Sequence, residues 1–158
     1  MPKVMMMCGK LCSGKTTYAK NLRKVGKAVI LSIDEIMLAL FDQDDGEKHD
    51  DYVAGINGYL YRKSLELIDS GIDVILDWGF WTKEERDYAR SFYGSNGVVN
   101  EFHFIDIEDS EWRRRIEKRN QDVLSNNSSA YYVDEGLLEK FDAIFERPDP
   151  SEMDFRVE

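Results

Sequence analysis

GKLCSGKT, residues 9–16, is the stretch that decides the fold of this 158-residue chain. It fits the pattern G-x-x-x-x-G-K-[ST] at every fixed position. An apolar run at residues 3–8 precedes it, and residues 15–24, which favour a helix, follow it. A strand, a glycine-containing turn and a helix in this order form a loop whose successive backbone N–H groups point at phosphate oxygens. The stretch therefore predicts a nucleotide phosphate site.

The side chains of this loop have separate chemical tasks. Lys15 places its ammonium on the β- and γ-phosphates, and Thr16 offers its hydroxyl to Mg²⁺. The N-terminus of the following helix adds partial positive charge. We therefore expect ATP and Mg²⁺ as cofactors. The residues that we expect to hold the nucleotide are Gly9, Cys12, Ser13, Gly14, Lys15, Thr16 and Thr17.

Apolar runs alternate with helical segments along the whole chain. The predicted strands are residues 3–8, 27–33, 72–76, 98–105 and 155–157. The predicted helices are residues 15–24, 34–41, 52–70, 83–93, 111–120 and 134–145, with polar loops at 42–51 and 121–130. This alternation indicates βαβ units and an α/β domain, with a parallel sheet covered by helices on both faces. We expect a single domain over residues 1–158.

Composition and charge exclude several classes of protein. Hydrophobic residues make up 42% of the chain, which is enough for a core and unlike a disordered segment. The net charge of −10 provides no general field for nucleic-acid phosphates, and no run approaches the roughly 18 apolar residues of a membrane span. Cys8 and Cys12 lack the second pair that a zinc site needs, and Cys8 fits a buried hydrophobic position. We expect a cytoplasmic protein with neither a membrane nor a nucleic-acid partner and leave its oligomeric state open.

Two aspartates directly follow apolar runs. Asp77 ends DVILD at residues 73–77, and Asp34 ends LSID at residues 31–34. Ligands of open α/β sheets bind beyond the carboxyl ends of the strands. We expect Asp77 to hold Mg²⁺ together with Thr16, and Asp34 to accept the proton of a substrate hydroxyl. A simpler role for Asp34 is that of N-cap of the helix that follows it.

The segment WRRRIEKRN, residues 112–120, places Arg115 and Arg119 on one helical face. Phosphoryl transfer spreads negative charge over the moving group, so arginines that close over it supply stabilisation. We expect both arginines to act in a lid at about residues 119–133. Arg113 and Arg114 instead fit a solvated face, paired with Glu111 and Glu117.

Aromatic residues follow Asp77 directly. Trp78 and Trp81 should lie at the carboxyl edge of the sheet, and Tyr59 comes from the segment after the second strand. Beside the acidic run 42–51, these aromatic rings favour a neutral or cationic hydroxyl compound as acceptor. A purely structural alternative is equally open, in which the aromatic residues fill the core and the acidic run is solvated.

Taken together, GKLCSGKTT (9–17), LSIDEI (31–36), VILDWGF (74–80) and RRIEKRN (114–120) resemble the small P-loop kinases of the nucleoside-monophosphate-kinase-like group. Within that group, they are most similar to the AAA-domain, zeta-toxin and polynucleotide-kinase-like proteins. The resemblance implies a five-stranded parallel sheet. It also implies that Asp34 is the base or substrate anchor, that Arg115 lies over adenine and that Arg119 reaches the phosphates.

The acceptor side departs from this group. Related kinases often carry an arginine a few residues after the second-strand aspartate, whereas this chain has EIML at residues 35–38. The favoured function is an ATP-dependent kinase that phosphorylates a hydroxyl of a small molecule, with Asp34, Tyr59, Trp78 and Trp81 on the substrate side. A polynucleotide 5′-hydroxyl kinase and a nucleotide-dependent switch remain the alternatives.

Overall fold

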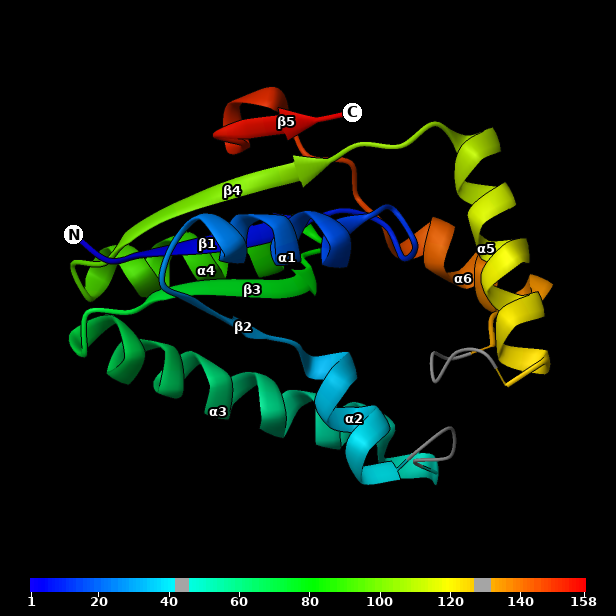
Figure 1. The fold of residues 1–158 in the computed structure, drawn as a ribbon, viewed down its shortest axis with the longest axis horizontal. Coiled ribbons are helices and arrows are strands. Elements are labelled where there is room, and N and C mark those ends of the chain that lie inside the picture. Colours follow the sequence, from blue (N-terminus) through cyan, green and yellow to red (C-terminus); the bar gives the residue numbers. More distant parts are fainter. Residues whose placement is uncertain (42–45, 127–131) are drawn as a thin grey trace.

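The computed structural model describes residues 1–41, 46–126 and 132–158. Within them, five strands form one sheet in the order β2-β3-β1-β4-β5, and every neighbouring pair is parallel (Figure 1). The strands are β1 (Lys3–Cys8), β2 (Ala28–Leu31), β3 (Asp73–Gly79), β4 (Val99–Ile105) and β5 (Phe155–Val157). The predicted α/β fold with a five-stranded parallel sheet is therefore confirmed.

Helices connect successive strands of the parallel sheet. They are α1 (Lys15–Val25), α2 (Ile33–Phe41), α3 (His49–Asp69), α4 (Lys83–Ser95), α5 (Asp109–Leu124) and α6 (Glu135–Ile144), with 3₁₀ turns at Gly46–Lys48 and Pro150–Glu152. Figure 1 shows α5 and α6 together beyond the carboxyl ends of β1 and β4. In the three described ranges, no helix combines the length and the apolar character that a membrane crossing needs.

Strand β1 divides its side chains between the two faces of the sheet. Val4, Met6 and Cys8 belong to a core cluster that includes residues of α3 and α4, whereas Met5 and Met7 belong to a second cluster with α1. This period of two is what a strand buried on both faces requires. Cys8 is fully buried as predicted, and burial raises the pKa of its thiol to about 12.

Helices α5 and α6 form a third, smaller cluster around Trp112, Ile116 and Leu138. Leu11 and Cys12 of the phosphate loop pack against this cluster. The apolar side of the two helices is thus buried against the loop rather than against the sheet, and this contact sets their position beside the phosphate loop.

Two predicted helix boundaries were wrong. Helix α3 begins at His49 instead of residue 52, with Asp50 and Asp51 in its first turn, where carboxylates interact favourably with the helix dipole. Helix α5 continues to Leu124, although residues 121–130 were predicted as a loop. Residues 121–124 contain neither glycine nor proline, so nothing local ends the helix earlier.

Residues 42–45 of the acidic run and 127–131 of the predicted lid lie outside the described residues.

The start of α2 also differs from the prediction. The helix begins at Ile33, so Asp34 lies in its first turn and is not its N-cap. The Oγ of Ser32 instead accepts a hydrogen bond of 3.2 Å from the backbone N–H of Glu35, as a capping serine does. The carboxylate of Asp34 is therefore not needed to cap the helix.

Candidate active site

The phosphate loop joins β1 to α1 and is attached to the neighbouring strand. Gly9 donates its N–H to the carbonyl of Gly79 at 2.9 Å. Gly14 has a φ of 100°, a left-handed conformation that favours glycine, just before α1 begins. A side chain on Gly14 would also meet Nη1 of Arg115 at 3.2 Å. Without a side chain on Gly14, the backbone of the loop stays accessible at the N-terminus of α1, which is a position where anions bind.

Lys15 extends back over this loop. Its Nζ donates a hydrogen bond of 2.9 Å to the carbonyl of Lys10. Burial lowers the pKa of this ammonium group, while the nearby carboxylates of Asp77 and Asp34 oppose that shift. An ammonium held by one carbonyl can turn to a phosphate, which offers a stronger, charge-assisted partner.

Thr16 and Asp77 lie in direct contact. The Oγ1 of Thr16 donates to Oδ2 of Asp77 at 2.7 Å, across the gap between α1 and β3. This hydroxyl–carboxylate pair is the ligand type that binds Mg²⁺ next to a nucleotide. Among the residues that the structure describes, no group of three or more His, Cys, Asp or Glu side chains could enclose a metal ion. The pair therefore fits Mg²⁺ that takes its remaining ligands from water and phosphate.

A cavity of about 940 Å³ opens in front of this pair. It brings together residues that the sequence analysis assigned to the nucleotide, the metal and the acceptor. The assigned residues in its wall are Cys12, Gly14, Lys15, Thr16, Thr17, Asp34, Asp77, Trp78, Trp81, Arg115 and Arg119. Its wall also includes Lys20, Arg23, Ser32 and Glu35, which the sequence analysis had not assigned to the site.

Three assigned residues lie elsewhere. Gly9 is packed behind the loop, where an added Cβ would come within 2.8 Å of the carbonyl of Ile105. Ser13 lines a second cavity instead. Tyr59 lines neither cavity. It lies on α3, where 51% of its surface is exposed and its ring is 5.8 Å from the ammonium of Lys63.

Arg115 and Arg119 extend from α5 to the phosphate loop. Nη1 of Arg115 donates to the carbonyl of Ser13 at 3.2 Å, and Nη1 of Arg119 lies 3.1 Å from Sγ of Cys12. The Nε of Arg119 is buried without a hydrogen-bond partner among the described residues. These two guanidinium groups can therefore exchange their loop contacts for phosphate oxygens without moving far.

The other arginines of α5, Arg113 and Arg114, are exposed, as predicted, but one of them has different partners. Arg114 pairs with Glu111, as expected, whereas Arg113 pairs with Asp109 and Glu135 and not with Glu117. Charge-assisted hydrogen bonds from Arg114 and Arg115 lower the pKa of the Glu111 carboxyl to about 2.

The tryptophans after Asp77 occupy different positions. Nε1 of Trp81 donates to the carbonyl of Gly9 at 3.2 Å, and its ring packs edge-on against Phe141 of α6. The ring of Trp78 packs edge-on against Tyr61, and its buried Nε1 has no partner within the described ranges. Trp81 therefore connects the loop to α6, while Trp78 lines the cavity and keeps its Nε1 buried.

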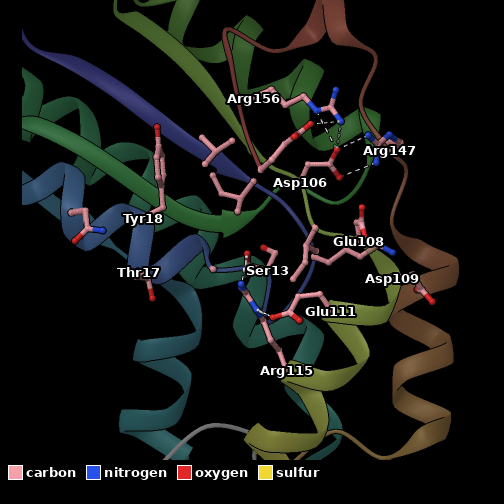
Figure 2. Close-up of a pocket in the computed structure, with 17 residues that line it drawn as sticks. Ser13, Thr17, Tyr18, Asp106, Glu108, Asp109, Glu111, Arg115, Arg147 and Arg156 are labelled. Atoms are coloured by element: carbon pink, nitrogen blue, oxygen red, sulfur yellow. Dashed lines mark hydrogen bonds and ion pairs between the residues drawn. The ribbon is translucent and has the colours of Figure 1, made fainter.

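The second cavity, of about 1160 Å³, lies beyond the phosphate loop (Figure 2). It shares Gly14, Thr17 and Arg115 with the first cavity. On its far side, Asp106 accepts hydrogen bonds from Arg147 and Arg156 (Figure 2). Two adjoining cavities that share the loop and Arg115 suit an elongated ligand.

The fold and this loop define a P-loop protein of the α/β class, whose fold is that of small P-loop kinases. Residues 4–148 match the family AAA_33, described as an AAA domain, and the chain belongs to this family. A search of curated proteins found no match.

Solved structures share the fold at low sequence identity. One is the APS kinase CysC of Mycobacterium tuberculosis in complex with AMPPNP and APS, which is 21% identical over 99% of this chain and 87% of that chain, with a TM-score of 0.67. A sugar kinase from Janibacter is 17% identical over 99% of this chain and 85% of that one, with a TM-score of 0.67. A chain of the Pnkp1/Rnl/Hen1 RNA repair complex is 19% identical and has a TM-score of 0.70, with 89% of this chain matched. That match spans only 42% of the RNA-repair chain.

Proposed function

We propose that this protein transfers the γ-phosphate of ATP to a hydroxyl group of a small molecule. The observation that carries the proposal is the shared cavity of Lys15, Thr16, Asp77 and Asp34. The first three residues are those that a P-loop enzyme uses for phosphate and Mg²⁺. Asp34 adds a carboxylate that is exposed in the same cavity and is not used to cap a helix.

The nucleotide would extend over both cavities. Its phosphates fit the loop, because Lys15 and Arg119 have only a neutral carbonyl and a cysteine sulfur as loop partners to give up. Its nucleoside fits the second cavity, which Arg115 joins to the first. Thr16 and Asp77 would hold Mg²⁺, which supplies charge neutralisation at the β- and γ-phosphates when it is bound. We further propose that α5 and α6 act as the lid.

The chemical step would need one proton acceptor and several fixed positive charges. The acceptor oxygen forms a bond to the γ-phosphorus while the bond to the β–γ bridging oxygen breaks, and ADP leaves. The hydroxyl proton passes to the carboxylate of Asp34. Lys15 and Arg119 stabilise the negative charge that spreads over the transferred group.

A nucleic-acid end is the second candidate acceptor. The observation that favours it is the similarity to a chain of an RNA repair complex. The net charge of −10 argues against a polyanionic partner, because it provides no general attraction for phosphates.

A comparison of two variants tests the proposed function. Asp34→Asn keeps the size of the side chain but removes the proton acceptor. We expect ATP·Mg²⁺ to bind it normally, while transfer falls by roughly 10²–10⁴-fold, the usual contribution of acid–base catalysis. Lys15→Ala should instead lose ATP affinity together with transfer, because the β/γ charge loses its main side-chain partner.

The measurement combines calorimetric titration with ATP·Mg²⁺ and mass detection of phosphorylated products from a library of hydroxyl compounds. Wild-type transfer by Asp34→Asn would remove Asp34 from the mechanism. Unchanged ATP affinity in Lys15→Ala would overturn the nucleotide site itself.

A further inference from the structure

Two carbonyl groups of the phosphate loop are held by tryptophans from distant parts of the chain. The carbonyl of Leu11 accepts a hydrogen bond of 2.6 Å from Nε1 of Trp112, which lies in the first turn of α5. The carbonyl of Gly9 accepts the longer bond of 3.2 Å from Trp81. Helix α5 therefore determines the direction in which the Leu11 carbonyl points.

Trp112 is fixed in place and is not itself a nucleotide contact. It is fully buried and lines neither cavity. The ammonium of Lys10 lies 4.3 Å from the centre of its ring and forms an ion pair of 3.1 Å with Asp142 of α6. Ile116 and Leu138 pack in the same buried cluster. Unlike the arginines that reach the loop from α5, this indole cannot turn to a phosphate.

A held carbonyl also fixes the N–H of the next residue. In a trans peptide, the C=O of one residue and the N–H of the following residue point in opposite directions. The bond from Trp112 to Leu11 thus directs the N–H of Cys12 away from Trp112. Cys12 lines the cavity of about 940 Å³, and Trp112 does not. The hydrogen bonds between backbone groups of the described ranges include none from this N–H.

The backbone conformation of Cys12 needs such support. Its φ of 59° is left-handed, and left-handed residues occur in the nests of N–H groups that surround anions. This conformation is costly for a residue other than glycine, and it persists only where the surroundings hold it. The bond between Trp112 and Leu11 holds the peptide that enters Cys12.

We propose that Trp112 is a positioning residue for nucleotide binding, which acts through the Leu11 carbonyl to hold the N–H of Cys12 toward the phosphates of ATP. The inference rests on the proposed function and adds to it a residue that touches neither nucleotide nor acceptor. A donor that is already oriented binds its ligand more tightly, because less ordering is needed on binding. The contact also fixes the base of the proposed lid to the loop.

A purely structural role would have different consequences. If Trp112 only filled the cluster between α5 and α6, its loss would lower the free energy of unfolding, as the loss of any neighbour in the cluster does. The folded protein would still bind phosphate groups as tightly as wild type. A positioning role instead weakens the binding of phosphates specifically.

Two variants separate these roles. Trp112→Phe keeps an aromatic ring but removes the N–H, whereas Ile116→Ala opens a cavity in the same cluster and leaves the bond to Leu11 in place. In Trp112→Phe, the Kd for ATP·Mg²⁺ should rise roughly tenfold or more, the worth of a hydrogen bond to a charged group. The Kd for adenosine, which has no phosphate, should stay unchanged. Ile116→Ala should lower stability in urea and change neither Kd.

A measurement on the wild-type protein applies even if Trp112→Phe fails to fold. In ¹⁵N-labelled protein, ADP·Mg²⁺ should move the amide proton of Cys12 downfield, because it gains a phosphate oxygen as acceptor. The indole N–H of Trp112 should be protected from exchange with solvent both before and after ADP binds. An unchanged Cys12 amide, or an indole that loses its protection on binding, would overturn the positioning role.

The outcomes also distinguish this inference from the proposed function. If wild type binds neither ATP nor ADP, both are overturned. If Trp112→Phe binds ATP as tightly as wild type, or loses affinity for adenosine as much as for ATP, the positioning role is overturned and the kinase stands. The same conclusion follows if Ile116→Ala weakens ATP binding as much as Trp112→Phe does.

Discussion

At the scale of single residues, Arg119 differs from an ordinary surface arginine. Its guanidinium contacts the sulfur of Cys12 and carries a buried Nε without a partner in the described ranges, so part of its hydrogen-bonding capacity is unused. A buried donor that lacks a partner costs free energy, and a phosphate oxygen would remove that cost. Arg114, on the same helix, is exposed and already paired with Glu111.

We therefore expect Arg119→Ala to lower kcat more than it lowers ATP affinity. The charge that this side chain meets is greatest in the transition state, so its removal affects the barrier more than the ground state. Steady-state kinetics and ATP titration measure the two effects. Arg114→Ala is the control and should leave both unchanged. A loss of ATP affinity with kcat intact would make Arg119 a ground-state binder.

At the scale of elements, the junction of β3 and α4 positions the phosphate loop. Gly79 has a φ of 92° and Phe80 a φ of 49°, and this turn brings Trp81 back against Gly9. The carbonyl of Gly79 accepts the N–H of Gly9 in the same place. An added Cβ on Gly79 would lie 2.4 Å from Nε1 of Trp81. The turn and the loop thus form one unit.

Gly79→Ala should therefore destabilise the protein by about 1–3 kcal/mol, the usual cost of a strained backbone conformation, and weaken ATP binding as well. Urea unfolding and ATP titration measure the two losses. The matched control is Gly94→Ala in α4, where an added Cβ meets no atom within 4 Å and φ is not positive. That change should stabilise or be neutral, because alanine is the better helix former. Equal effects of the two variants would contradict the role of the turn.

At the scale of the whole molecule, Asp106 joins three distant parts of the chain. It follows β4 and accepts hydrogen bonds from Arg147, which lies after α6, and from Arg156 in β5. Both guanidinium groups are more than half exposed, but the side chain of Asp106 is only 12% exposed. Hydrogen bonds from Arg147 hold the pKa of this carboxyl below its ordinary value of 3.8, and Arg156 adds to the shift. The C-terminal segment is thereby attached to the edge of the sheet.

Asp106→Asn should lower the free energy of unfolding by about 1–2 kcal/mol at pH 7, a value reduced for the exposure of the arginines. Because the folded pKa is lower than the unfolded one, this stabilisation is complete above pH ~4 and disappears as the pH falls through the folded pKa. Chemical denaturation at pH 7 and pH 3 should thus show a gap between variant and wild type that narrows in acid. Asp87→Asn, which breaks an exposed pair with Lys83, should leave the stability almost unchanged, because solvent screens this pair. A gap that stays constant with pH would rule out the ionised carboxylate as its cause.

Local patterns were sufficient to predict the strand–loop–helix of residues 3–24 and the aspartate at the end of the third apolar run. A glycine-containing phosphate loop is defined by its own backbone, and parallel strands bring their carboxyl ends to one edge. Helix ends were less predictable. Helix α3 begins at His49 and helix α5 ends at Leu124, inside segments that were predicted as loops, because residues 49–51 and 121–124 include no glycine or proline and permit either state.

The sequence by itself determined the fold, the phosphate loop and the residues suited to Mg²⁺. Only the tertiary structure decided which side chains share a wall with them. Lys20 and Arg23 look like solvated helix residues in the sequence, and Tyr59 looks like a substrate contact, yet the cavity includes the first two and not the third. The physical reason is that a motif consists of residues that are neighbours along the chain. The wall of a cavity depends instead on how α1 packs beside β2, and no local sequence pattern encodes that packing.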